Sequence, residues 1–377
     1  MIIGVSGVLP ATYKGLLFKS ASEPATLTEI PTPKLDAGSV FVKPLFSWVQ
    51  SYANELYTNG NPRRYAIPFP TVGGTGAIGR VVAVGPDTTK LDVGDLVTVE
   101  PIIRMRDDPD IYYVQPLGPA MTERARGVTR SVWRHGSWAE LVKAPLENVL
   151  RIDEDSLRRH GVAIHDLGFL GQLVIPYGGL RDVNLSAGET VLISPATGGF
   201  GGAAVHVALA MGARVIAMGR NETILAELKA LAPSRIETVT ISGSEEADVA
   251  ALSRLGIIDV FYDLTPRKVT NLSHIRAGIL SVRSGGRISF SGGVEDINIP
   301  YKAIMDKNLT VKGTTMYTRE QALELIKMVE TGVLRLGPKA GLIVKHIFKL
   351  EDWAEAIETA AKEAGAGSIV LFAPTEG

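Results

Sequence analysis

The sequence predicts two domains, one built mainly of β-strands and one in which parallel strands alternate with helices. Three observations support this prediction. The chain has 377 residues, of which 45% are hydrophobic, so it is long enough to form two separate cores. Its first part consists of short apolar runs between turn-forming residues. From about residue 155 onward, strand-like runs alternate with segments that have the apolar periodicity of helices.

Residues 11–100 have the pattern of a compact β-barrel. Apolar runs such as 39–45 and 79–85 are bounded by glycine, proline and other turn formers, and a Gly-Asp pair at 94–95 separates two further runs. Residues 101–135 contain six arginines and no clean periodicity. A connection of this length is either a solvated surface excursion or a lid or dimer contact that also shapes the substrate pocket.

The second domain has the alternation that is typical of βαβ units with right-handed crossovers, and therefore of a doubly wound parallel sheet. Strands are expected at 190–194, 213–218, 237–242, 258–264, 286–292 and 367–372, and the clearest helices at 200–212 and 319–331. The apolar strand 286–292 is a candidate edge strand that would pair with a second copy across a two-fold axis.

A glycine-rich turn, SPATGGFGG, lies between a strand that stops at Ser194 and a helix that starts near Phe200. Its glycines let a pyrophosphate approach the free N–H groups at the helix N-terminus, and let helix and strand pack closely. The first glycine of the G-x-G-x-x-G pattern is missing, but the strand–turn–helix–strand context predicts a dinucleotide site. The predicted cofactor-binding residues in this turn are Thr197, Gly198, Gly199, Phe200 and Gly201.

The residues after the second strand distinguish NAD from NADP. An acidic side chain there would bind the ribose 2′-hydroxyl of NAD, but this chain reads Gly219-Arg220-Asn221. Arg220 can form a bidentate contact with a 2′-phosphate, and Asn221 can add a hydrogen bond. We therefore predict NADPH as the cofactor. Ser291 and Gly292, which follow a later strand, are also predicted to bind it.

Composition excludes several classes of function. The chain has no cysteine, which rules out disulfides, thiolate nucleophiles and zinc sites that use cysteine. With a formal net charge of −1 and no long basic run, nucleic acid and anionic membranes are unlikely partners. The sequence shows no signal peptide and no uninterrupted apolar run of membrane-spanning length. A cytoplasmic location is therefore the expectation.

Several stretches resemble the medium-chain dehydrogenase/reductase superfamily over nearly the whole chain. They are VGGTGAIGRVVAVG (72–85), KLDVGDLVTV (90–99), GSWAELVKAP (136–145), the segment 185–221 that contains the glycine-rich turn, and GGRISFSGG (285–293). The resemblance implies a GroES-like β-barrel domain at 1–154, a Rossmann domain with a doubly wound parallel sheet at 155–312, and a return to the first domain at 313–377. It also implies an active site in the cleft between the two domains.

The departures from the family pattern indicate which branch the chain resembles. Zinc-dependent members have Gly-His-Glu where this chain has Gly74-Thr75-Gly76, so the histidine ligand is missing, as are all cysteine ligands. The zinc-independent branch of quinone oxidoreductases and enoyl reductases is the better match, and no metal site is predicted. Pro195 stands where relatives often have alanine or glycine, which predicts a slightly altered phosphate turn.

Without a metal, hydride transfer to an activated alkene or a quinone is easier than alcohol oxidation, because the substrate's own carbonyl delocalises the charge. The protein then needs to supply position, hydrogen-bond donors and a proton. Resemblance places residues 46–70 along the cleft, so Tyr52, Tyr57 and Tyr65 are candidate proton donors or hydrogen-bond donors to an enolate. Asn54 falls near a polar position that relatives use close to the nicotinamide. Each tyrosine has an alternative role as a packing residue.

The resulting prediction is a zinc-independent NADPH-dependent oxidoreductase acting on a small α,β-unsaturated carbonyl or quinone, and forming a homodimer. Two alternatives remain open. One is a zinc-free carbonyl reductase or alcohol dehydrogenase, which shares the cofactor and differs in the acceptor. The other is a nucleotide-binding member of the superfamily that performs non-redox chemistry, such as a cyclase or an isomerase. The altered first position of the phosphate turn favours this last alternative.

Overall fold

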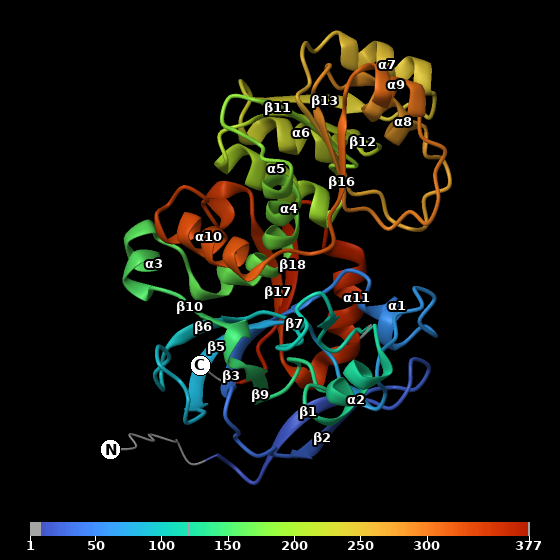
Figure 1. Ribbon diagram of the computed structural model, residues 1–377. Coiled ribbons are helices and arrows are strands. Elements are labelled where there is room, and N and C mark those ends of the chain that lie inside the picture. Colours follow the sequence, from blue (N-terminus) through green and yellow to red (C-terminus); the bar gives the residue numbers. More distant parts are fainter. Residues whose placement is uncertain (1–8, 119–120, 376–377) are drawn as a thin grey trace. The chain divides into compact units, whose positions relative to one another are not determined.

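The structure is a computed structural model that describes residues 9–118 and 121–375 (Figure 1). The chain divides into two compact units. Unit 1 comprises Met1–Gly171, Leu342–Ala364 and Ser368–Gly377, and unit 2 comprises Gln172–Gly341 and Gly365–Gly367. Both divisions fall later in the chain than the expected boundaries at 154/155 and 312/313.

Unit 1 is built around a seven-stranded sheet in the order β10-β6-β5-β3-β18-β17, with β9 also paired to β3, and a three-stranded sheet in the order β2-β1-β4. The strands are β1 (Thr12–Phe18), β2 (Thr26–Pro31), β3 (Ser39–Val49), β4 (Thr71–Val72), β5 (Ala77–Val84), β6 (Leu96–Val99), β9 (Val142–Pro145), β10 (Val149–Arg151), β17 (Ile343–Phe348) and β18 (Ser368–Phe372). Buried valines from β3, β5, β6 and β9 form a common core. The two sheets are the predicted GroES-like β-domain.

The arginine-rich segment at 101–135 has more regular structure than the sequence indicated. It forms a hairpin of β7 (Ile102–Arg104) and β8 (Tyr112–Val114), followed by helix α2 (Glu123–Ser131). The side chain of Thr122 caps α2 by accepting a hydrogen bond from the N–H of Ala125 at 3.2 Å. The helix was hard to predict because only Ala125 and Thr129 of its residues are buried, which gives too few apolar positions to define a period.

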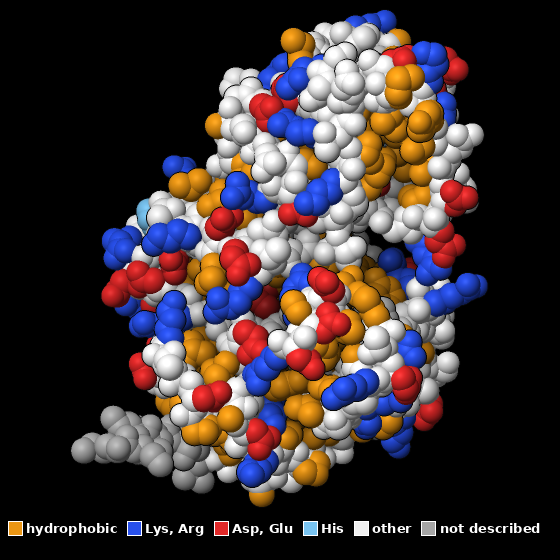
Figure 2. Space-filling model, viewed as in Figure 1, with side chains coloured by type: hydrophobic (Ala, Val, Ile, Leu, Met, Phe, Trp, Pro, Cys, Tyr) orange, Lys and Arg blue, Asp and Glu red, His pale blue; other side chains and the backbone are white. Residues whose placement is uncertain are grey.

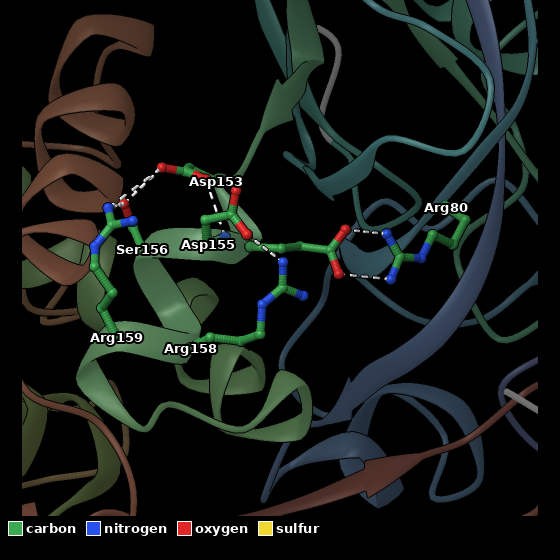
Figure 3. Close-up of polar contacts among 7 residues, drawn as sticks. Arg80, Asp153, Asp155, Ser156, Arg158 and Arg159 are labelled. Carbon is green, nitrogen blue, oxygen red and sulfur yellow. Dashed lines mark hydrogen bonds and ion pairs between the residues drawn. The ribbon is translucent and has the colours of Figure 1, made fainter.

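Helix α3 (Glu154–His160) explains why unit 1 extends beyond residue 154. Glu154 at its first position forms a two-pronged ion pair with Arg80 of β5, and Asp153 caps the helix through the N–H of Asp155 (Figure 3). The short 3₁₀ helix that follows, Ile164–Phe169, contacts β3, β5, β17 and β18. These contacts attach the whole stretch to the β-domain.

Helix α10 (Arg319–Glu330) explains in the same way why unit 2 extends beyond residue 312. Its Glu324 accepts hydrogen bonds from the Tyr177 hydroxyl at 2.7 Å and from Arg181 at 3.0 Å, both on helix α4 (Leu170–Asp182). Gln321 of α10 donates to Asp182 at 2.9 Å. The helix predicted at 319–331 is therefore present, but it packs on unit 2.

Unit 2 is a six-stranded, fully parallel sheet in the order β13-β12-β11-β14-β15-β16. Its strands are β11 (Thr190–Ser194), β12 (Arg214–Gly219), β13 (Ile236–Thr240), β14 (Val260–Asp263), β15 (Arg287–Phe290) and β16 (Thr310–Gly313), and its further helices are α5 (Gly199–Ala210), α6 (Glu222–Leu231), α7 (Glu245–Ser253), α8 (Ser273–Ser281) and α9 (Tyr301–Asp306). Because the order reverses at β11, right-handed crossovers place helices on both faces. The predicted Rossmann fold is confirmed.

The prediction that residues 286–292 form an edge strand is wrong. The corresponding strand, β15, lies between β14 and β16, and the edges of the sheet are β13 and β16. The apolar character of β15 reflects its interior position, where Ile288 and Ser289 are fully buried. All four residues of the edge strand β16 are exposed.

The core of unit 2 is a cluster of fully buried side chains from the central strands and their helices, including Leu192, Ile216, Phe261 and Ile288. Burial of each such side chain stabilises the fold by about 1.5–3 kcal/mol. This core fixes the carboxyl ends of β11, β12 and β15, where the predicted cofactor-binding residues lie. No helix among the described residues is both long and apolar enough to cross a membrane.

Candidate functional site

The glycine-rich turn connects β11 to α5 as predicted. Gly198 is the N-cap of α5 and has φ −94° and ψ 173°, so its conformation does not itself require glycine. No atom lies within 4 Å of the place where a Cβ at Gly198 would stand. A Cβ at Gly201, in contrast, would lie 2.1 Å from the backbone oxygen of Pro195. Gly201 therefore allows close packing of helix on turn, and Gly198 leaves open the approach to the N-terminus of α5, where an anion is favoured.

The residues around the turn hold its shape. A Cβ at Gly219, at the end of β12, would lie 2.5 Å from the side-chain methyl of Thr197, so the turn packs directly on that strand end. A Cβ at Gly199 would lie 2.4 Å from the side-chain nitrogen of Gln172. Gln172 is buried, and its side-chain oxygen has no partner in the part of the chain that the structure describes. Phe200 lies in the first turn of α5 and is partly buried.

The end of β12 presents a cation and an amide. Arg220 is exposed, and no carboxylate occupies positions 219–221. Asn221 caps α6, with its side-chain oxygen accepting from the N–H of Ile224 at 3.1 Å. This hydrogen bond occupies the side-chain oxygen, so the amide N–H groups of Asn221 are available to other acceptors. Burial lowers the pKa of His274, and the positive charge of Arg220 lowers it further.

A buried polar network lies at the end of β14. The Thr265 hydroxyl donates to Asp263 at 2.5 Å, and lies 2.9 Å from the ring nitrogen Nε2 of His274. Burial raises the pKa of Asp263 to about 6, against the opposing effect of its bonds with Thr265. Ser291 donates its backbone N–H to the oxygen of Asp263 at 3.0 Å, and a Cβ at Gly292 would lie 2.5 Å from an Asp263 carboxylate oxygen. The two predicted residues thus follow β15 beside this network.

The predicted tyrosines all lie in unit 1, around helix α1 (Ala53–Tyr57). The guanidinium of Arg63 stands 4.3 Å from the ring centre of Tyr52. Burial raises the pKa of Tyr52, and the charge of Tyr65 raises it further. Tyr65 is partly exposed, and its backbone N–H donates to the Asn61 side chain at 3.1 Å. Of the predicted tyrosines, Tyr65 therefore interacts electrostatically with Tyr52.

Tyr57 and Asn54 have different surroundings. Tyr57 is fully buried, with its ring stacked on Phe18 at 4.6 Å and close to Trp138 at 5.3 Å. Burial raises the pKa of its hydroxyl, and the neighbouring backbone N–H of Gly74 acts against this rise. Asn54 uses its side-chain oxygen to accept from the N–H of Glu55 at 2.8 Å, and lines an apolar groove between α1 and α11 (Trp353–Glu363).

Two family models match the chain in the order of its domains. Residues 40–154 match the alcohol dehydrogenase GroES-like domain, and residues 199–331 match the zinc-binding dehydrogenase domain. The chain belongs to the medium-chain dehydrogenase/reductase superfamily. The predicted membership of this superfamily is confirmed, and the protein is an oxidoreductase.

The relatives and solved structures span the whole length of this medium-chain dehydrogenase/reductase. L-threonine 3-dehydrogenase from Yersinia pestis (strain Pestoides F) is 27% identical over 364 residues, covering 95% of this chain and 99% of that protein. An alcohol dehydrogenase from E. coli CFT073, solved with NADH, has a TM-score of 0.76 at 18% identity and covers 97% and 100% of the two chains. A crotonyl-CoA carboxylase/reductase has a TM-score of 0.76 at 15% identity and covers 98% and 90%. The two solved structures support the fold.

The residues of this chain do not fit the zinc ion that the second family description implies. Thr75 stands where the resemblance places a histidine ligand, and its hydroxyl accepts a hydrogen bond from the side-chain amide of Gln50. Zinc in proteins prefers thiolate, imidazole and carboxylate ligands, and an amide with a hydroxyl supplies none of these. Among residues 9–118 and 121–375, no group of three or more His, Asp or Glu side chains could hold a metal ion.

Gln50 and Gln172 are two buried amides that the sequence analysis missed, as it missed the network of Asp263, Thr265 and His274. Both are buried amides whose side-chain oxygen has no partner among the described residues, one beside Thr75 and one beside the glycine-rich turn. The signal in the sequence was weak: Gln50 is a single polar residue at the end of the apolar strand β3, and Gln172 follows Gly171 near the start of α4.

Proposed function

We propose that the protein is a zinc-independent, NADPH-dependent reductase that transfers hydride to an α,β-unsaturated carbonyl or a quinone. One observation carries the choice of cofactor: an exposed arginine, Arg220, follows β12 where an acidic residue would select NAD. The open space at Gly198 and the free amide of Asn221 lie at the carboxyl ends of neighbouring strands. Together these groups suit a diphosphate and a 2′-phosphate.

The choice of an activated alkene follows from the donors that unit 1 offers. Hydroxyl and amide groups stabilise negative charge on an oxygen, but they do not acidify an alcohol as zinc does. Hydride addition to an enone or quinone places its charge on the substrate's carbonyl oxygen, where hydrogen bonds are sufficient. The name of the crotonyl-CoA carboxylase/reductase, which shares this fold, is in line with such chemistry.

A second candidate is interconversion of a carbonyl and an alcohol. It is favoured by the match to L-threonine 3-dehydrogenase over 95% of this chain. It uses the same cofactor site, so cofactor binding does not separate it from the first candidate. Product analysis does, because an enone yields a saturated carbonyl in the first case and an allylic alcohol in the second.

The cofactor is tested by calorimetry with NADPH and NADH on the intact chain and on two variants. In Arg220→Ala, NADPH affinity is expected to fall about 10- to 100-fold, the value of a charge-assisted hydrogen bond, with little change for NADH. Arg254→Ala removes an exposed arginine at the end of α7 and serves as the matched control. Equal affinities of the intact chain for both dinucleotides would refute NADP selectivity.

The acceptor is tested by mixing the intact chain anaerobically with NADPH and a panel of enones, quinones and ketones. Loss of NADPH absorbance with enones or quinones, together with a saturated product, supports the proposal. Turnover of ketones alone would replace it by the second candidate. Tight NADPH binding without turnover of any acceptor would favour non-redox chemistry in this superfamily member.

A further inference from the structure

A polar cluster in unit 1 surrounds Thr75, in the turn between β4 and β5. Gly74 on one side of Thr75 has φ 93°, and Gly76 on the other has φ 68°, so the turn follows a path that favours glycine. Gln50, which follows β3, is only 1% exposed and donates its side-chain amide to the Thr75 hydroxyl. The side-chain oxygen of Gln50 is buried and has no partner in the described part of the chain.

The direction of this hydrogen bond determines what Thr75 can do. A threonine hydroxyl has one proton to donate and two lone pairs. Because Gln50 occupies a lone pair, the proton of Thr75 stays available to an acceptor outside the pair. Thr75 is partly exposed whereas Gln50 is buried. The hydrogen bond therefore connects a buried amide to a hydroxyl at the surface of the domain. A hydroxyl that accepts a hydrogen bond becomes a stronger donor.

The turn is also held in place from its far side. The Ser47 hydroxyl donates to the backbone oxygen of Gly76 at 3.2 Å and lies 2.6 Å from the Ser137 hydroxyl. The backbone N–H of Ser137 donates to the oxygen of Gly74 at 3.2 Å. The Thr75 hydroxyl is therefore fixed before any ligand arrives, which is the condition for effective stabilisation of a developing charge.

We propose that the Thr75 hydroxyl, oriented by Gln50, donates the hydrogen bond that stabilises the negative charge on the substrate's carbonyl oxygen during hydride transfer. This inference rests on the proposed function. NADPH held by the residues around Gly198 and Arg220 would supply the hydride that adds to the β-carbon, leaving NADP⁺, and the electrons of the C=C bond would then form an enolate. Thr75 donates to the enolate oxygen, and a proton from water or from a phenol then adds to the α-carbon. Thr75 is the catalytic residue and Gln50 a positioning residue.

The unpartnered oxygen of Gln50 is the second observation that points to a ligand here. A buried acceptor without a hydrogen bond destabilises the fold, and folded proteins rarely contain one. A bound substrate that brings its own donor, such as a hydroxyl or an amide N–H next to the carbonyl, would satisfy it. We therefore expect the preferred substrates to be carbonyl compounds that carry such a donor.

The test compares Thr75→Val, Thr75→Ser and the matched control Thr12→Val, which removes an exposed hydroxyl from β1. Loss of one charge-stabilising donor is expected to lower kcat about 10²- to 10³-fold in Thr75→Val, with NADPH affinity unchanged in calorimetry. Thr75→Ser and Thr12→Val are expected to retain kcat within a few-fold. A Thr75→Val variant with normal kcat would overturn the proposal.

Gln50→Glu tests the hydrogen bond between Gln50 and Thr75 without changing the length of the side chain. An ionised carboxylate only accepts hydrogen bonds, so it captures the proton of Thr75 and turns the hydroxyl away from the substrate. Activity is expected to be low at neutral pH and to recover as the pH falls and the carboxyl is protonated. Gln50→Glu with the pH profile of the unmodified chain would contradict the assigned role of Gln50.

One further measurement separates this inference from the proposed function. If the unmodified chain binds NADPH but reduces no acceptor, the proposed reaction fails. In that case the hydrogen bond from Thr75 can still be measured. The carbon-13 chemical shift of a labelled enone carbonyl, bound together with NADP⁺, reports whether Thr75 donates to the carbonyl oxygen. A downfield shift that disappears in Thr75→Val supports the hydrogen bond, and identical shifts in both proteins refute it.

Discussion

His206 on helix α5 is expected to make the stability of unit 2 depend on pH. The side chain is 7% exposed, and its Nε2 has no partner in the described part of the chain. Burial lowers its pKa from 6.5 to about 4. The folded protein therefore keeps this imidazole neutral, whereas the unfolded chain protonates it near pH 6.5.

The size of the effect follows from the two pKa values. The pKa is depressed in the folded state, so the contribution to stability is complete above pH 6.5 and is lost as the pH falls toward 4. One unit of pKa corresponds to 1.36 kcal/mol, so the full loss is about 3 kcal/mol, of which about 2 kcal/mol is lost by pH 5. His206→Leu removes both the titrating group and the unpartnered nitrogen while keeping most of the packing volume.

The assay is urea unfolding, followed by far-ultraviolet circular dichroism at pH values from 7.5 to 4.5. The unmodified chain is expected to lose about 2 kcal/mol more than His206→Leu between neutral pH and pH 5. His160→Gln, at the exposed C-terminal end of α3, is the control and is expected to follow the unmodified chain. If the unmodified chain and His206→Leu lose stability in parallel, the assignment of the acid sensitivity to His206 is wrong.

Two further predictions concern the glycine-rich turn and the edge of the sheet. Gly198→Ala should fold normally but bind NADPH more weakly in calorimetry, whereas Gly201→Ala should lower the free energy of unfolding by about 1–3 kcal/mol, because its Cβ would stand 2.1 Å from a backbone oxygen. We also expect two copies to pair through β16, beside the exposed Tyr301 and Met305 of α9, where Figure 2 shows hydrophobic side chains gathered. Val311→Lys should then convert a dimer to a monomer in light scattering, and an unchanged mass would refute this interface.

The sequence predicted the two-domain fold because both periodicities are strong and local. Runs of alternating strand and helix specify a parallel sheet, and the handedness of their crossovers leaves few arrangements. The order of the strands was harder to obtain. The sequence analysis places residues 286–292 at an edge because they are apolar. An apolar strand, however, indicates burial on both faces and therefore an interior position in the sheet. The edge strand on this side of the sheet is β16, which has the sequence TVKG. Its side chains do not alternate between exposed and buried.

The local structure around the proposed cofactor-binding residues could be predicted because these residues lie close together in the sequence. Gly198, Gly201 and Arg220 belong to one strand–turn–helix–strand unit, so the order of residues along the chain determines their order in space. The roles of the tyrosines could not be predicted, because they depend on contacts between distant segments. Tyr57 packs on Phe18 and Trp138, and neither contact leaves a trace in the local pattern.

The contact between Gln50 and Thr75 could be predicted from the sequence if the pairing register of two strands were known. Strands β3 and β5 are antiparallel, and their pairing ends with Phe46 opposite Ile78. Continuing that register brings the residues just after β3 toward those just before β5, which is where Gln50 and Thr75 lie. The sequence identified Thr75 only as a missing zinc ligand. Once the register is known, the same position becomes a hydroxyl donor with a buried amide behind it. The substitution of Thr75 is therefore the decisive test of the role proposed for this hydroxyl.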